Sequence, residues 1–300
     1  MIDQPDELQP FYYNGERPFE IASAPTSIGK MQDNRRDYEE RLQALGEQID
    51  ERQQVMYAHD RHAMLLIFQA IDAAGKDGTI RAVMSGINPH GVEVHAFKQP
   101  SSRELDHDFL WRTNKFFPPR GRIGIFNRSY YEEVLIVRVH SEIIDNVQRI
   151  PHELTADREL MWRRRYEDIR NLERYHYHNG TRIVKFFLHL SKDEQARRFL
   201  SRIERPSKNW KFAGSDVRER ARWDEYQHLF EEAVNQTAAP HAPWYAIPAD
   251  NKRTMRLLVA KAVLAQLRDL DMDYPQMSDD RLEKLDGYRR QLLKELENGD

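Results

Sequence analysis

Apolar runs recur along the chain and are separated by charged stretches of helical length. The segment Ala63–Ile71 (AMLLIFQAI) contains no charged residue, as is typical of a strand that is buried on both faces of a parallel sheet. The sequence predicts four more strands, at Val92–Phe97, Arg122–Asn127, Thr181–Leu190 and Trp244–Ile247.

The charged segments around these strands predict helices. We expect them at Arg36 to about Asp60, Lys76 to about Gly86, Ser101–Phe116, Asp157–His178, and about 192–204, 216–236, 251–270 and 279–297. Strands that alternate with helices indicate βαβ units. The predicted fold class is therefore α/β, with a mostly parallel sheet.

Composition narrows the choice of function. With 300 residues the chain can form one large domain or two small ones, and without cysteine it can form neither disulfides nor thiolate sites. No apolar run reaches the length of a membrane span, and the acidic, polar N-terminus is unlike a signal peptide, so a cytoplasmic protein is expected. A net charge of −3 argues against nucleic acid as a partner.

The segment Ala70–Thr79 follows the first predicted strand and opens a helix, as a phosphate-binding loop does. Small residues let backbone N–H groups turn toward phosphate oxygens, and Lys76 would offset their charge. The motif is imperfect, because Ala70 stands in place of its first glycine and Asp77 in place of its hydroxyl residue. Asp72, an acid in an apolar loop, needs a metal or a basic partner, and Mg²⁺ would serve. The alternative is an ordinary strand–turn–helix.

A polar triplet, Asn127-Arg128-Ser129, ends the third strand. Ligands gather at the carboxyl ends of parallel strands, so this triplet should lie beside the loop. Asn127 could hold a metal-bound water, and Arg128 could bind a phosphate. The alternative is a polar strand end that caps the next helix.

The segment Glu204–Asp216 interrupts the alternation of strands and helices and is flanked by basic residues. We interpret it as a lid that closes over phosphates and excludes water. Its candidate phosphate contacts are Arg198, Arg202, Arg205, Lys208 and Lys211. A solvated loop is the alternative.

Five segments together resemble the family-2 polyphosphate kinases. QAIDAAGKDGTI is similar to that family's Walker A segment and FNRSYYEEVLIVRVH to its Walker B region. FKQPSSRELDHDFLWR, LSKDEQARRFLSRIERPSKNWKFAGSDVRERARWDEY and PWYAIPADNKRTMRLLVAKAVL resemble its intervening helix, its lid and its last strand and helix. The similarity runs in order from about Tyr38 to Leu267.

The resemblance implies a three-layer αβα P-loop kinase fold with a helical lid. It divides the chain into an N-terminal arm and helix (1–60), a kinase domain (61–270, lid about 198–216) and a C-terminal helix (271–300). The implied reaction transfers the terminal phosphoryl group of inorganic polyphosphate to AMP and ADP, giving ADP and ATP, with Mg²⁺. A homo-oligomer, a dimer or tetramer, is expected, with neither nucleic acid nor membrane as a partner.

The resemblance also assigns roles to residues. The catalytic residues would be Asp72, Lys76, Asn127 and Arg128. The phosphate-binding residues would be Ala73, Ala74, Gly75, Lys76, Asp77, Gly78, Thr79, Arg128, Arg198, Arg202, Lys208 and Lys211. Nucleotide would contact Asp72, Asn127, Arg128, Glu132 and Arg112, and Mg²⁺ would be held by Asp72 and Asn127, in part through water.

Asn127 departs from the family's commonest pattern, in which this position is aspartate. This difference argues against direct contact between a carboxylate and the metal at position 127. The Asn-Arg-Ser form, followed by Glu132, is similar to the sequence of the subgroup that acts on both AMP and ADP. Two other functions stay open: an ATP-dependent nucleoside monophosphate kinase, and a non-catalytic polyphosphate-binding module.

Overall fold

The computed structural model describes residues 4–297. Within that range six strands form one sheet in the order β1-β6-β5-β2-β4-β3. The strands are β1 (Tyr12–Tyr13), β2 (Ala63–Gln69), β3 (Val92–Ala96), β4 (Ile123–Asn127), β5 (Thr181–His189) and β6 (Trp244–Pro248). All neighbours are parallel except β1, which pairs antiparallel with β6. The five predicted strands are confirmed, and β1 is too short to give a periodic signal.

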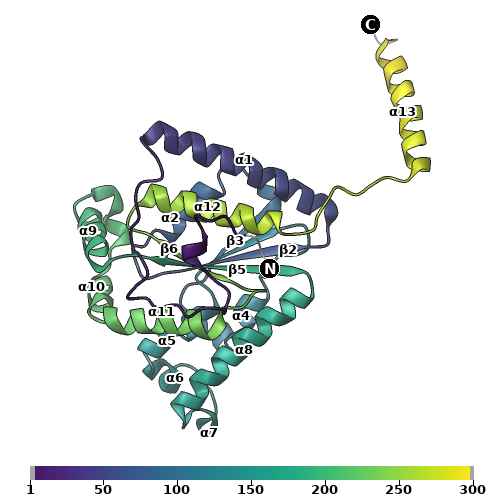
Figure 1. The fold of residues 1–300 in the computed structure, drawn as a ribbon. Coiled ribbons are helices and arrows are strands. Elements are labelled where there is room, and N and C mark those ends of the chain that lie inside the picture. The colour runs from purple at the N-terminus through teal and green to yellow at the C-terminus, as the bar shows by residue number, and fades with distance from the viewer. Residues whose placement is uncertain (1–3, 298–300) are drawn as a thin grey trace.

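Helices cover both faces of the sheet (Figure 1). The longer ones are α1 (Arg35–His59), α2 (Lys76–Val83), α8 (Arg158–His178), α9 (Lys192–Ile203), α10 (Gly214–Ala221), α11 (Trp223–Thr237), α12 (Lys252–Arg268) and α13 (Asp279–Glu297). Short helices are α3 (Ser102–Leu105), α4 (Trp111–Asn114), α5 (Ile136–Val139), α6 (Glu142–Asn146) and α7 (His152–Thr155). α1, α2 and α12 pack on one face and α8 and α11 on the other. The predicted three-layer αβα architecture is confirmed.

The helix predicted at Ser101–Phe116 is wrong, because two short helices, α3 and α4, take its place. The break lies at Asp108, whose carboxylate accepts hydrogen bonds from the backbone N–H groups of Leu110 and Trp111 at 2.9 and 3.1 Å. A side chain that bonds to the backbone in this way starts a new helix rather than continuing one. The capping pair of Ser101 and Glu104 is present as expected.

The single helix predicted at 216–236 is also wrong. Arg222 leaves helical geometry (φ −92°, ψ 22°) and separates α10 from α11. Its guanidinium donates a hydrogen bond to the carbonyl of Val139, at the end of α5. The break between α10 and α11 therefore depends on a contact between residues far apart in the sequence, and no local sequence pattern indicates it.

The N-terminal arm runs across the molecule and is tied to it at several points. The backbone N–H and carbonyl of Phe19 bond to the amide side chain of Asn235 at 2.7 and 2.9 Å. Further on, the hydroxyl of Thr26 donates to Asp250 at 3.0 Å. The arm thus connects β1 to the loop after β6.

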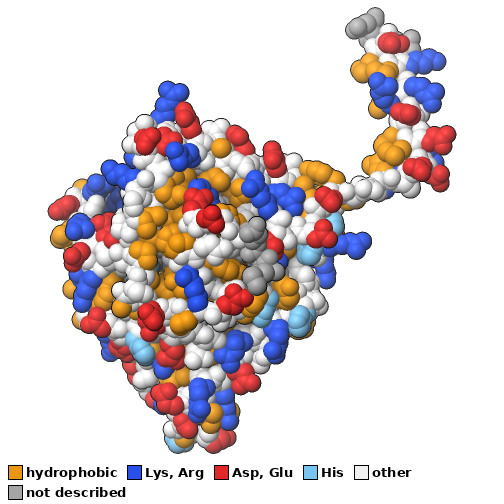
Figure 2. All heavy atoms as spheres, viewed as in Figure 1, with side chains coloured by type: hydrophobic (Ala, Val, Ile, Leu, Met, Phe, Trp, Pro, Cys, Tyr) orange, Lys and Arg blue, Asp and Glu red, His pale blue; other side chains and the backbone are white. Residues whose placement is uncertain are grey.

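Helix α13 stands away from the body of the protein (Figure 1). Its apolar side chains are exposed, and Figure 2 shows them interspersed with charged ones along the helix. They are Leu282, Leu285, Tyr288, Leu292, Leu293 and Leu296. None of the helices within residues 4–297 has the length and apolar character needed to span a membrane.

His176, at the end of α8, makes stability depend on pH. Its ring stacks on Phe117 with 3.5 Å between centroids, and burial lowers its pKa from the usual 6.5 to about 4. At pH values between these two pKa values, His176 is protonated in the unfolded chain but neutral in the folded one. The free energy of unfolding should therefore fall as the pH is lowered from 6.5 to about 4.

The test compares thermal unfolding of the wild type and His176→Phe across this pH range. Phenylalanine keeps the stacking but has no proton to bind, so the variant should lose less stability on acidification. An equal loss in both proteins would contradict the assignment.

Candidate active site

The phosphate-binding loop connects β2, the central parallel strand, to α2. Two of its residues adopt positive φ, Ala73 (66°) and Gly75 (106°). Gly75 tolerates this conformation because it has no Cβ, whereas at Ala73 it is strained. Lys76 begins α2, and its ammonium donates to the carbonyl of Ala70 at 2.7 Å. The loop therefore wraps around its own lysine.

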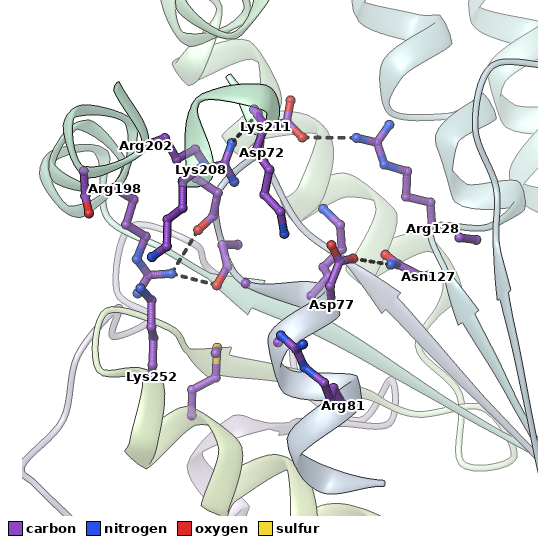
Figure 3. Close-up of a pocket in the computed structure, with 18 of the residues that line it drawn as sticks. Asp72, Asp77, Arg81, Asn127, Arg128, Arg198, Arg202, Lys208, Lys211 and Lys252 are labelled. Atoms are coloured by element: carbon purple, nitrogen blue, oxygen red, sulfur yellow. Dashed lines mark hydrogen bonds and ion pairs between the residues drawn. The ribbon is translucent and has the colours of Figure 1, made fainter. Parts of the chain in front are cut away.

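Two residues from β4 and the turn after it join the loop, as predicted. Asn127 pairs in register with Phe68 of β2, which brings the ends of the two strands together. The Arg128 guanidinium lies 3.1 Å from a carboxylate oxygen of Asp72. The Asn127 amide donates to Asp77 at 2.6 Å. Figure 3 shows both contacts at one edge of the cavity.

Burial and neighbouring charges shift the protonation of this group. Lys76 is half-buried, and its pKa is lowered by desolvation and by the nearby Arg128. The pKa of Glu132 is raised by burial, which Arg128 opposes through a 3.4 Å ion pair. The pKa of Arg128 is raised, chiefly by Glu132. A cationic Lys76 here is short of counter-charge, so an incoming phosphate would stabilise it.

A cavity of about 990 Å³ opens over the loop, and its walls carry eleven Lys and Arg side chains against three carboxylates. This excess of positive charge stands in a chain whose net charge is −3, so the basic residues are concentrated here. The eleven cations are Lys76, Arg81, Lys98, Arg128, Arg197, Arg198, Arg202, Lys208, Lys211, Lys252 and Arg256. Figure 3 shows Lys208, Lys211 and Arg202 on the side of the cavity opposite Arg81.

Five of these cations are missing from the sequence prediction. Arg81 comes from α2, Lys98 from the segment after β3, Arg197 from α9, and Lys252 and Arg256 from α12. One signal was available, since Lys252 and Arg256 lie four residues apart at the start of a helix, where the helix dipole disfavours cations unless an anion is bound.

Three predicted phosphate- or nucleotide-binding residues, Thr79, Arg112 and Arg205, lie outside the residues that line the cavity. Thr79 is buried within α2, and its hydroxyl donates to the carbonyl of Gly75 at 3.0 Å. Arg112 donates to the carbonyl of Lys98 at 2.7 Å and lies beside Glu104, outside the residues that line the cavity. Arg205 of the lid segment is exposed and does not line the cavity either, whereas the other predicted phosphate-binding residues do.

A second, small cavity of about 50 Å³ lies across Asp72 and Arg128 from the first. Glu132 forms part of its wall, and the opposite wall is built from α10 and α11. Its apolar lining consists of Ala70, Ile71, Leu135, Ile136, Trp223 and Phe230. Asp72 and Arg128 therefore stand between a cationic cavity and a partly apolar one.

No cluster of three or more metal-ligating side chains occurs within residues 4–297. Mg²⁺ is usually held by one or two carboxylates together with the phosphates of its substrate. Asp72 and Asp77 provide such carboxylates on the cavity wall, beside the amide of Asn127. The donor set therefore fits Mg²⁺ that arrives with phosphate.

Residues 32–275 match the family model described as Polyphosphate kinase 2. The chain belongs to the polyphosphate kinase 2 family. Among curated relatives, an ADP-polyphosphate phosphotransferase of Rhodopseudomonas palustris is 50% identical over 275 residues, which cover 92% of this chain and 94% of the relative. An AMP/ADP-polyphosphate phosphotransferase of Meiothermus ruber is 42% identical over 79% of this chain and 84% of its own length.

The crystal structure of polyphosphate kinase 2 from Arthrobacter aurescens superimposes on this fold with a TM-score of 0.80 at 34% identity. The similarity covers 95% of this chain and 96% of that one. As a polyphosphate kinase 2 family member, the chain is an enzyme that transfers phosphoryl groups on a P-loop kinase fold. The structural similarity to this family member thus extends over nearly the whole chain.

Proposed function

We propose that this enzyme transfers the terminal phosphoryl group of inorganic polyphosphate to AMP and to ADP, giving ADP and ATP. The cationic cavity is the observation that carries the proposal. Eleven cations lining about 990 Å³ suit a long, linear polyanion better than the short triphosphate of a nucleotide. The names of the relatives from R. palustris and M. ruber point to the same donor.

Each of the two cavities binds one of the two substrates. Polyphosphate lies in the large cavity, with its terminal phosphate on the loop beside Lys76 and its following units along the lid, near Lys208 and Lys211. The acceptor nucleotide approaches from the small cavity, whose apolar walls suit a base. Because that cavity measures only about 50 Å³, α10 must move outward to admit a nucleoside.

Asp72 and Arg128 stand between the substrates and orient the acceptor phosphate. An oxygen of that phosphate attacks the terminal phosphorus of polyphosphate in line. The bond to the bridging oxygen breaks, and polyphosphate leaves one unit shorter. Lys76 and Arg128 offset the charge that spreads over the transferred group. One phosphoanhydride replaces another, so the reaction runs in both directions and no phosphoenzyme forms.

Mg²⁺ fits this scheme and is proposed as the cofactor. Asp72 would hold it directly, and Asn127 would hold one of its waters, since its amide nitrogen is engaged by Asp77 and its carbonyl oxygen stays available. When bound, Mg²⁺ neutralises phosphate oxygens and fixes their geometry.

Use of both AMP and ADP is supported by Glu132. Its half-buried carboxylate lies between Arg128 and the small cavity, where the acceptor's phosphates pass. We also propose a cytoplasmic location and a homo-oligomer, a dimer or tetramer. The exposed apolar side chains of α13 support the second of these.

The function is tested by chromatography of nucleotides after incubation with Mg²⁺, polyphosphate and AMP, ADP or neither. We expect ATP from ADP, and ADP followed by ATP from AMP. Product from ADP alone would restrict the acceptor to nucleoside diphosphates. No product with polyphosphate, but ADP from ATP and AMP, would replace the proposal with an ATP-dependent nucleoside monophosphate kinase. Binding of polyphosphate without any turnover would leave a binding module.

A further inference from the structure

Arg198 differs from the other cations of the cavity because its side chain is nearly buried and its donors are all engaged. Its Nε donates to Glu194 at 3.0 Å. One terminal nitrogen donates to the carbonyls of Ala73 and Ala74 at 3.0 and 2.7 Å. The other donates to the carbonyls of Ala249 and Asp250 at 2.6 and 3.0 Å. A guanidinium has five N–H donors, so none remains for a phosphate oxygen.

The four carbonyls belong to two separate loops. Ala73 and Ala74 lie in the phosphate-binding loop after β2, whereas Ala249 and Asp250 follow β6 and lead into α12. β5 lies between these two strands in the sheet. Arg198 therefore joins two loops that no backbone pairing connects.

The neighbouring side chain of α9 extends this arrangement. Gln195, one turn before Arg198, donates to the carbonyl of Asp72 at 3.0 Å. Three consecutive carbonyls of the loop, at residues 72–74, thus point toward α9. The loop's catalytic carboxylate and its lysine then face the other way, into the cavity.

The second loop leads into α12, which contributes Lys252 and Arg256 to the cavity wall. Asp250 receives hydrogen bonds from the backbone N–H of Ser191 at 2.8 Å and from the Thr26 hydroxyl at 3.0 Å. Lys252 follows directly and lines the cavity. Besides the packing of α12 on α2, Arg198 therefore ties this wall to the phosphate-binding loop.

We infer that Arg198 is a positioning residue, which fixes the phosphate-binding loop against the β6–α12 loop, rather than a ligand of the phosphate chain. The first half of α9 is then a rigid part of the site. The part of the lid that moves begins after Arg198 and includes Arg202, Lys208 and Lys211.

The first test needs no substrate. Arg198→Lys keeps the charge but cannot reach four carbonyls in two directions. Amide hydrogen exchange of the ligand-free enzyme should speed up about tenfold or more at residues 72–76 and 249–252. The matched control is Arg197→Lys, because the Arg197 side chain is 69% exposed and forms a surface ion pair with Glu194. This substitution should leave the exchange of both segments unchanged.

The second test uses polyphosphate and rests on the proposed function. Loss of a positioning group should lower kcat by about 10- to 100-fold. The slope of log KM for polyphosphate against log salt should stay the same, because no phosphate contact is lost. A phosphate ligand would instead raise KM and reduce that slope by about one. A raised KM with a reduced salt slope, together with unchanged amide hydrogen exchange, would overturn the inference.

If Arg198→Lys does not fold, a second variant replaces it in the exchange experiment. Gln195→Ala removes one of the loop's three bonds, and it should speed exchange at residues 72–74 in the same way. Unchanged exchange in that variant would overturn the inference. If the wild type makes no nucleotide from polyphosphate, the proposed function fails, while the exchange measurements still decide the role of Arg198.

Discussion

Replacing Lys76 with methionine should lower kcat for ATP formation by at least about a thousandfold, while the protein stays folded. Lys76 is the cation of the phosphate-binding loop, and its ammonium lies inside the turn of that loop, 2.7 Å from the carbonyl oxygen of Ala70. Removing one preorganised donor from a transition state costs about 10²- to 10³-fold, and a charged donor costs more. Methionine keeps the apolar stem, so the packing should survive.

The measurement is the initial rate of ATP formation from polyphosphate and ADP, together with a thermal unfolding curve for each protein. Lys284→Met, on the projecting helix α13, is the matched control and should keep its full rate. A rate within tenfold of the wild type for Lys76→Met would remove Lys76 from the catalytic machinery.

Replacing Lys185 with methionine should destabilise the fold by about 3–5 kcal/mol. Lys185 of β5 is fully buried and pairs with Glu173 of α8 at 2.6 Å. The same carboxylate accepts hydrogen bonds from the hydroxyls of Tyr130 and Tyr131 at 2.9 and 2.8 Å. Without the ammonium, a buried carboxylate would stand with two neutral donors, which do not replace a charge.

The free energy of unfolding is measured from urea unfolding curves, and the urea concentration at the midpoint is compared between each variant and the wild type. The control, Arg35→Met, breaks an exposed ion pair with Glu39 and should leave the free energy of unfolding nearly unchanged. Equal losses from the two substitutions would show that burial adds nothing to the Lys185–Glu173 pair. Since Tyr130 and Tyr131 lie two and three residues after Arg128, this network also holds the turn that carries Arg128.

The sequence predicts the parts of this site that lie in one segment. Asp72 and Lys76 share a loop whose strand–turn–helix context is visible in the residue pattern, and Arg128 follows an apolar run. Asp72 and Arg128 could be brought together from sequence because parallel strands end at a common edge. The five predicted strands were also found from local patterns, because four of them are mostly apolar and Val92–Phe97 alternates apolar with polar residues.

What the sequence does not predict depends on contacts between distant segments. Arg256 reaches the cavity because α12 packs beside α2, where its guanidinium lies close to Gly78. The engagement of Arg198 depends on carbonyls about 50 and 125 residues away. Backbone carbonyls carry no residue signature, so a basic residue bound to them looks the same in sequence as one that binds phosphate.

The two tyrosines of β1 have a further consequence, for solubility. β6 (WYAIP) is buried along its whole length and would otherwise end the sheet with free backbone donors and acceptors. Such an edge is a template for pairing with another chain. Tyr12 and Tyr13 occupy it, and the Arg17 guanidinium covers the ring of Tyr13 at 4.4 Å. Two residues of strand thus protect an enzyme against the intermolecular β-pairing that leads to aggregation.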